Sequence, residues 1–179
     1  MTGSSADGKR RFLVQHDYGM GALLWWIDAR SAREILETFA EVEVVENAES
    51  IERALADSLE VVDVDAAEVV AGLSRRPSEQ RDHPDFGKLA GRPVVHLRRP
   101  PAPEFGDRSV YFFEVESDGR RLRQVEIGED GVAVKSTPDD WLFDPPVVDL
   151  FAPETAAWEI GRDEFEAAWR TAAPMPSDF

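Results

Sequence analysis

The sequence predicts an α+β fold, in which an antiparallel sheet made of an N-terminal hairpin and a C-terminal three-stranded meander has several short helices packed on it. Three observations predict this class. Two apolar and aromatic stretches, 11–18 and 22–29, flank the turn sequence GMG. Two turns of the Asp-Gly type interrupt alternating segments within 108–136. Short amphipathic patterns that begin with helix-capping residues flank these segments.

The length sets the expected organisation. A chain of 179 residues is long enough to bury one core of its own. We therefore expect one globular domain over 11–172, with a disordered tail at 1–10 and a second tail at 173–179. We also expect the hairpin and the meander to belong to one continuous sheet.

The N-terminal hairpin leads into a helix. In a strand over 22–29, Trp25 and Trp26 point to opposite faces, which makes Trp25 the core residue of the pair and leaves Trp26 either covered by a helix or partly open. The following segment, 31–39, reads as a helix that Ser31 caps and Glu34 closes as its capping-box partner. This is the clearest local signal in the chain.

The next segment alternates between strands and helices. The sequence EVEVV at 41–45 predicts a half-buried strand whose outer face carries glutamates, and a helix over 48–57 follows with Ile51 and Leu55 inward. Val61, Val62 and Val64 then suit a strand, and DAAE at 65–68 opens another short helix.

The C-terminal half is mainly β. Residues 74–92 mix Pro, Gly and charges and predict a long loop. A strand over 93–99 follows, and then the meander over 108–136. A helix over 159–172 closes the fold, because Phe165, Ala168 and Trp169 fall at helical spacing.

The charge is strongly negative and uneven. The chain has 36 acidic and 20 basic side chains and a formal net charge of −16, which repels nucleic acid backbones. Residues 28–68 contain 13 acids and 3 bases, whereas residues 75–99 contain 3 acids and 7 bases. We expect two electrostatic poles. The basic stretch could bind an anion or pair with the acidic pole, and the pairing is the favoured interpretation.

Several classes of protein are excluded. With no cysteine there is neither a disulfide nor a thiolate site, which fits a reducing compartment. The polar N-terminus lacks a secretory signal, and no run of about 18 apolar residues could span a bilayer. A cytoplasmic protein without membrane contact is the expectation.

No cofactor, metal or catalytic motif stands out. The three histidines, His16, His83 and His96, lack metal-ligand spacing. There is no glycine-flanked serine for a nucleophile and no glycine loop leading from a strand into a helix. Asp139, Asp140 and Asp144 crowd one loop, but they lack the pattern of a calcium site, so a solvated turn anchored by aromatic residues is expected.

The C-terminal half has a familiar pattern. A strand with the form R-x-V-E occurs at 123–126. The later sequence E-I-x-x-x-E-F-E-x-x-W is matched by Glu159, Ile160, Glu164, Phe165, Glu166 and Trp169. These motifs resemble a small domain of unknown function associated with immunity proteins of polymorphic toxin systems. With HDYGMG and PDDW added, the chain resembles uncharacterised actinobacterial proteins. The resemblance implies a protein that binds and neutralises another protein.

Charge and resemblance together give a functional hypothesis. The sequence favours an acidic protein, immunity- or antitoxin-like, that engages and neutralises a basic protein partner, such as a toxin, by steering toward its positive groove. The expected partner-binding residues are Trp26, Glu41, Glu43, Glu46, Asp139, Asp140 and Trp141. The alternative is a small-molecule-binding or enzymatic domain with an aromatic pocket lined by His16, Tyr18, Trp26 and Trp141.

Overall fold

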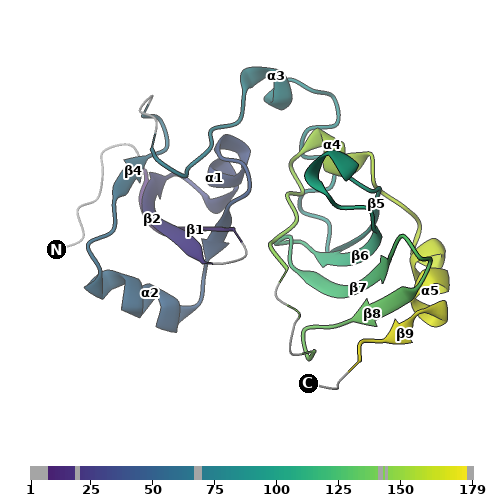
Figure 1. Ribbon diagram of the computed structural model, residues 1–179. Helices are drawn as coiled ribbons and strands as arrows, with labels where there is room; N and C mark the ends of the chain where they lie inside the picture. Colours follow the sequence, from purple (N-terminus) through teal and green to yellow (C-terminus); the bar gives the residue numbers. More distant parts are fainter. Residues whose placement is uncertain (1–7, 19–20, 67–69, 141–142, 144, 177–179) are drawn as a thin grey trace. The chain divides into compact units, whose positions relative to one another are not determined.

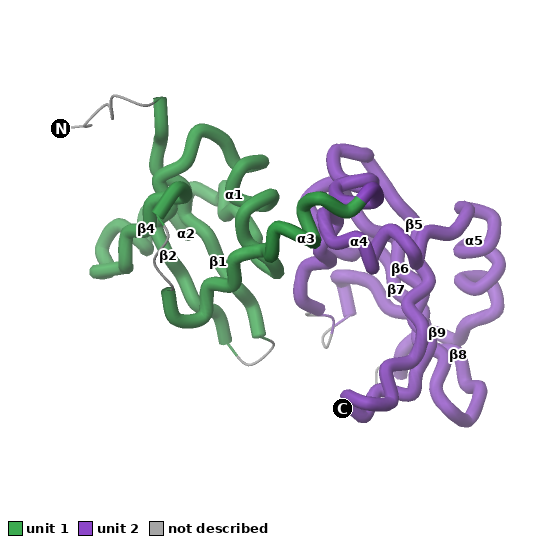
Figure 2. The backbone as a smooth tube through the Cα atoms, turned by 90° about the horizontal axis from the view of Figure 1, so that it is seen from above, with its two compact units in different colours: residues 1–83 green, residues 84–179 purple. Residues whose placement is uncertain are grey.

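The chain forms two compact units, residues 1–83 and residues 84–179 (Figure 2). The computed structural model describes residues 8–18, 21–66, 70–140, 143 and 145–176. Each unit has its own sheet, its own helices and its own hydrophobic core (Figure 1). The α+β class is confirmed.

The expectation of one continuous sheet is wrong. The first sheet has four strands in the order β3 (Glu43–Val45), β1 (Arg10–Asp17), β2 (Ala22–Ala29) and β4 (Val61–Asp63). The second has five strands in the order β5 (Val94–Arg99), β6 (Val110–Glu116), β7 (Arg121–Ile127), β8 (Ala133–Ser136) and β9 (Ala173–Pro174). The reason is local, because both edges of the N-terminal hairpin pair with strands that follow within the same unit. The sequence predicts one domain over 11–172. In the structure, Leu73 packs in the core of unit 1 and Leu89 packs in the core of unit 2, so the chain passes from one core to the other between these residues.

Unit 1 is built on the predicted hairpin. β1 and β2 pair antiparallel along their full length, with Val14 opposite Trp25 and Leu13 opposite Trp26. β3 pairs antiparallel with β1, and β4 pairs parallel with β2. The elements of unit 1 are β1 (Arg10–Asp17), β2 (Ala22–Ala29), α1 (Ala32–Thr38), β3 (Glu43–Val45), α2 (Ala48–Ala56), β4 (Val61–Asp63) and α3 (Ser78–Arg81).

The two tryptophans lie on opposite faces of this sheet. Trp25 joins the main core, which includes Ile35 and Phe39 from α1 and its end. Trp26 packs on the other face with Leu13 and with Ala54 of α2. A shift of one residue would exchange the two faces, so burial of both rings fixes the register.

Polar residues cap both longer helices of unit 1. Ser31 accepts a hydrogen bond from the Glu34 backbone N–H at 3.1 Å, as expected. The Glu34 carboxylate reaches back one residue further than a capping box requires and accepts from the Arg30 N–H at 2.7 Å. Asn47 caps α2 by accepting from the Ser50 N–H.

Three sequence expectations for unit 1 differ from the structure. The third strand begins at Glu43, because Glu41 has a positive φ of 56° that ends the extended conformation. On α2 the buried residue is Ala54, while Leu55 is exposed. The expected helix at 65–68 falls partly outside the described residues, and 64–65 form a turn.

Unit 2 contains the predicted meander. β6, β7 and β8 pair antiparallel in order, with a register shift between Glu114 and Val115. The elements are β5 (Val94–Arg99), a 3-10 turn η1 (Pro103–Phe105), β6 (Val110–Glu116), β7 (Arg121–Ile127), β8 (Ala133–Ser136), α4 (Pro153–Ala156), α5 (Arg162–Thr171) and β9 (Ala173–Pro174).

Both faces of the second sheet bury side chains. Phe113 and Leu97 pack on one face with Leu150. Phe112 and Phe165 form the core on the other face, under α5. The helical spacing of the C-terminal segment therefore identified its buried residue, Phe165, correctly.

Some residues of the two expected tails, 1–10 and 173–179, belong to strands. Arg10 is the first residue of β1, and Ala173 and Pro174 pair with β8 as the short strand β9. Among the described residues, no helix is long and apolar enough to cross a membrane.

Two turn glycines of unit 2 allow a stability test. Gly119 and Gly131 both have positive φ, but a Cβ on Gly119 would lie 2.4 Å from the Val148 carbonyl oxygen, whereas one on Gly131 meets nothing within 4 Å. Gly131→Ala should cost about 1 kcal/mol from backbone strain alone. Gly119→Ala should cost about 3 kcal/mol, because the Val148 backbone must also move. Urea unfolding of both variants measures the difference, and equal costs would contradict this account.

Candidate functional site

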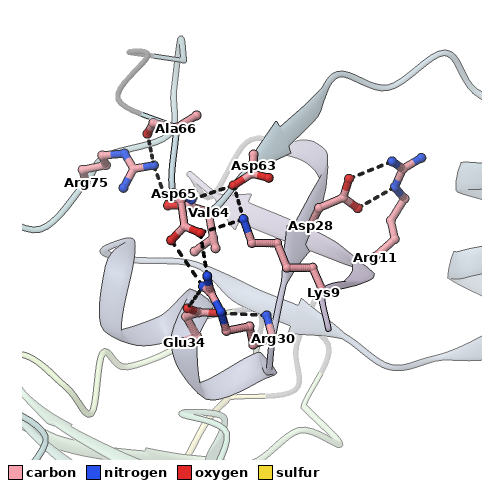
Figure 3. Close-up of polar contacts among 10 residues, drawn as sticks. All are labelled: Lys9, Arg11, Asp28, Arg30, Glu34, Asp63, Val64, Asp65, Ala66 and Arg75. Atoms are coloured by element: carbon pink, nitrogen blue, oxygen red, sulfur yellow. Dashed lines mark hydrogen bonds and ion pairs between the residues drawn. The ribbon is translucent and has the colours of Figure 1, made fainter. Parts of the chain in front are cut away.

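A network of ion pairs surrounds the start of unit 1 (Figure 3). The Lys9 Nζ lies 2.6 Å from Asp63 and 2.7 Å from Asp65, and its side chain is only 7% exposed. Arg30 contacts Asp65 at 2.8 Å and Glu34 at 2.6 Å. The network therefore ties the residue before β1 to the end of β4 and to α1.

The sheet pairing explains why these charges meet. Arg11 and Asp28 are direct partners in the β1–β2 register, and the guanidinium donates two hydrogen bonds of 2.9 Å to the carboxylate. The parallel β2–β4 pairing places Asp63 opposite Asp28. Lys9 then offsets the negative charge of Asp63, which would otherwise stand beside another carboxylate.

The network holds its carboxylates in the charged form. A hydrogen bond from Lys9 lowers the pKa of Asp63, and hydrogen bonds from Arg30 and then Lys9 lower the pKa of Asp65. Arg11 lowers the pKa of Asp28 in the same way. These acids are satisfied within the unit, so the network is structural.

Arg75 and Arg76 also have structural roles. The Arg75 guanidinium donates to the carbonyls of Val64 and Ala66 (Figure 3) and lies over the Phe39 ring. Arg76 is buried and donates to the Leu36 carbonyl. These two basic residues thus hold the end of unit 1 against α1.

Other members of the basic stretch pair with acids outside the acidic stretch. Arg92 contacts Glu159, and Arg99 contacts Asp107, both within unit 2. The expected pairing of these two residues with the acidic segment 28–68 is therefore not what the structure shows.

A second set of acids in unit 1 is left exposed. Six exposed acidic residues of unit 1 make neither a side-chain hydrogen bond nor an ion pair with any residue in the described part of the chain: Glu46, Glu52, Asp57, Glu60, Glu79 and Asp82. Four of them lie in α2 or within four residues of its ends. We call these four the α2 acidic surface: Glu46, Glu52, Asp57 and Glu60.

An exposed leucine lies within this surface. Leu55 is 69% exposed and stands one turn after Glu52 on the same side of α2. Ala48 and Ala56 on this side are also exposed. On the inward side of the helix, Ala54 and the partly buried Ile51 pack with Leu13 and Trp26 of the sheet. The prediction that Leu55 points inward with Ile51 is wrong, because residues three and four positions after Ile51 both suit burial by helical spacing and the structure buries Ala54 instead.

The expected partner-binding residues of unit 1 fall in different environments. Trp26 is only 8% exposed and is covered by α2, which excludes it as a surface anchor in this fold. Glu41 is exposed, and its backbone carbonyl accepts a hydrogen bond from His16 Nδ1 at 2.7 Å. Glu43 lies in β3 opposite Gln15. Of the residues expected, only Glu46 belongs to the α2 acidic surface.

The expected residues of the C-terminal half belong to unit 2. Asp140 has a structural role, because its carboxylate accepts from the Thr137 N–H at 2.7 Å and from the Thr137 hydroxyl at 3.2 Å. Asp139 is exposed in the same turn. Trp141 lies outside the described residues.

The residues of the alternative pocket do not converge within unit 1. His16 is the register partner of Leu23 and shares the face of Trp25, whereas Trp26 points to the opposite face. Tyr18 is 57% exposed next to the hairpin turn. His16 and Trp26 therefore cannot line one concave site, and Trp141 is not among the described residues.

In unit 2, side chains of the two motifs on which the family resemblance rests contact each other. The guanidinium of Arg123, from R-x-V-E, contacts Glu114 and lies 2.7 Å from Glu166, from E-F-E-x-x-W. It also lies over the rings of Phe165 and Trp169. Arg123 lowers the pKa of both glutamates. The motifs therefore form one ionic and aromatic contact that fastens α5 to the sheet.

No metal centre is formed by the described residues, because no three His, Asp or Glu side chains among them are grouped to hold an ion. No model of a known protein family matches the sequence, and comparisons with curated proteins and with solved structures give no match. The residues of the two units are therefore the basis for the functional proposal.

The role of Lys9 can be tested through the pH dependence of stability. Asp63 and Asp65 have a lower pKa in the folded chain than the ordinary value of 3.8, so their contribution is present above that pH and is lost as the pH falls through the lowered values. Lys9→Met should destabilise the protein near neutral pH, and the deficit should shrink toward about pH 2. Urea unfolding over this range measures it.

Lys88→Met is the matched control, because Lys88 pairs with Asp85 while both side chains are well exposed. It should change the free energy of unfolding less than Lys9→Met does. A Lys9→Met deficit that stays constant with pH would show that lost packing, and not the ion pairs, causes it.

Proposed function

We propose that this protein is an acidic binding protein that engages a basic protein partner and neutralises it, as an immunity protein or antitoxin does. The observation that supports this function is the α2 acidic surface, with its four unpaired carboxylates and the exposed Leu55 among them. The proposal assigns the binding role to this surface.

The division of the acids in unit 1 supports this assignment. Three acids of this unit already form ion pairs: Asp28 with Arg11, Asp63 with Lys9 and Asp65 with Arg30. Their negative charge is therefore largely balanced within the unit and attracts a partner only weakly. The carboxylates of the α2 acidic surface have no such partners among the described residues. An arginine or lysine of a partner would meet them without first breaking an ion pair.

Charge and apolar area would contribute differently to binding. Unpaired surface carboxylates attract a basic protein over about 10 Å at moderate salt and so raise the association rate. Leu55 would supply apolar contact that slows dissociation once the surfaces have met. A partner whose basic groove binds phosphates would be blocked, because the carboxylates would take the phosphate positions.

The test is capture of a basic protein from the native cells by the full chain at about 50 mM and about 500 mM salt. The variant Glu52→Lys/Asp57→Lys should lose the captured protein, because it reverses two charges of the α2 acidic surface while lysine at position 57 still suits the C-terminal end of the helix. Capture should also decrease at the higher salt.

The matched control is Glu104→Lys/Glu154→Lys, which makes the same change in net charge at exposed positions of unit 2. It should keep the captured protein, and Leu55→Ala should weaken capture at both salt concentrations. Co-expression with the captured protein then tests neutralisation: the wild-type chain should relieve its toxicity and Glu52→Lys/Asp57→Lys should not. If the matched control lost the captured protein to the same extent, the loss would follow from the change in net charge alone, and this result would contradict the assignment of binding to the α2 acidic surface.

A further inference from the structure

On one face of the second sheet, Arg121 has no counter-ion among the described residues. The Arg121 guanidinium lies 4.0 Å from the centroid of the Phe113 ring. Its Nη1 donates to the neutral side-chain oxygen of Gln124 at 2.7 Å, and its buried Nε has no hydrogen-bond partner. No carboxylate pairs with this guanidinium anywhere in the described chain.

A second arginine approaches the same place from the other side of β6. Arg99 of β5 lies 4.5 Å from the centroid of the Tyr111 ring, and its Nε is also buried without a partner. The Tyr111 and Phe113 rings stack with centroids 5.8 Å apart on one face of β6. Because β5 and β7 flank β6, the two guanidinium groups converge over this ring pair.

The nearby acids are already engaged. Asp107 pairs with Arg99. Glu126 accepts hydrogen bonds from the hydroxyls of Ser109 and Tyr111 at 2.9 and 3.2 Å. Asp107 therefore balances the charge of Arg99, whereas the hydroxyl donors leave the negative charge of Glu126 in place. Within the described residues, the Arg121 guanidinium has no ion-pair partner.

Such an arrangement costs stability. Burial and then the charge of Arg99 lower the pKa of Arg121 to about 10, which shows that the surroundings disfavour its charged form. Arg121 is half-buried, and a cation that is partly removed from water without an ion-pair partner is uncommon in folded proteins. Ring contact with Phe113 offsets part of the cost but leaves the Nε unpaired.

We propose that Arg121 and Arg99 form a binding site for the carboxylate group of a small-molecule ligand. A ligand carboxylate would supply one negative charge as the counter-ion of Arg121, and its two oxygens match the planar donors of a guanidinium. A phosphate dianion would leave excess negative charge beside Asp107 and Glu126. This site lies in unit 2 and is independent of the α2 acidic surface.

The test is titration of the full chain with sodium acetate, with the arginine Nε–H signals followed by NMR and with sodium chloride at equal ionic strength as reference. The Nε–H signals of Arg121 and Arg99 should shift and saturate with acetate and not with chloride. Arg121→Gln should weaken acetate binding at least about tenfold. Arg120→Gln, at the adjacent exposed residue that pairs with Asp118, should leave it unchanged.

A parallel titration with sodium phosphate distinguishes the two anions, and phosphate binding more tightly than acetate would overturn the carboxylate assignment. The variant Arg121→Lys keeps the positive charge but lacks the planar guanidinium donors. It therefore distinguishes loss of acetate binding caused by missing donors from loss caused by unfolding. Unshifted Arg121 and Arg99 signals throughout the acetate titration of the wild-type chain would overturn the proposal and assign Arg121 to ring packing alone.

Discussion

The pairing of β1 with β2 is the constraint on which unit 1 depends. It fixes Trp25 and Trp26 on opposite faces, and each ring then needs its own cover. α1 and the segment up to Leu73 cover one face, and α2 covers the other. Because both faces are buried by local segments and both edges are paired, the hairpin cannot extend into the meander, and a separate sheet forms downstream.

This arrangement also sorts the charges of unit 1. Acids that the sheet pairing brings close together, such as Asp28 and Asp63, lie beside Arg11 and Lys9 and stabilise the fold. Acids on the helix that covers Trp26 face outward, since only its inner side contacts the sheet. Structural and exposed acids are therefore separated by position in the fold, and net charge alone does not distinguish them.

Unit 2 uses arginine in two ways on the two faces of one sheet. Arg123 lies among Glu114, Glu166 and the rings of α5, so its charge is balanced and its role is to attach the helix. Arg121, two residues earlier on β7, contacts Phe113 on the other face with only an amide oxygen as acceptor. The register shift between Glu114 and Val115 makes Arg121 the partner of Val115. Two arginines on the same strand therefore differ in charge balance: Arg123 is paired with carboxylates, whereas the acceptor of Arg121 is a neutral amide oxygen.

Signals within a few residues predict the hairpin, the meander, the Ser31 cap and the buried Phe165, because turn residues, capping residues and helical spacing act locally. Which side chains remain exposed depends on packing between elements. Leu55 and Ala54 are adjacent in one helix, and the side of the helix that packs on Trp26 and Leu13 buries Ala54 and leaves Leu55 exposed. Ion-pair partners, such as Lys9 with Asp63, lie far apart in sequence, and no local pattern encodes their distance.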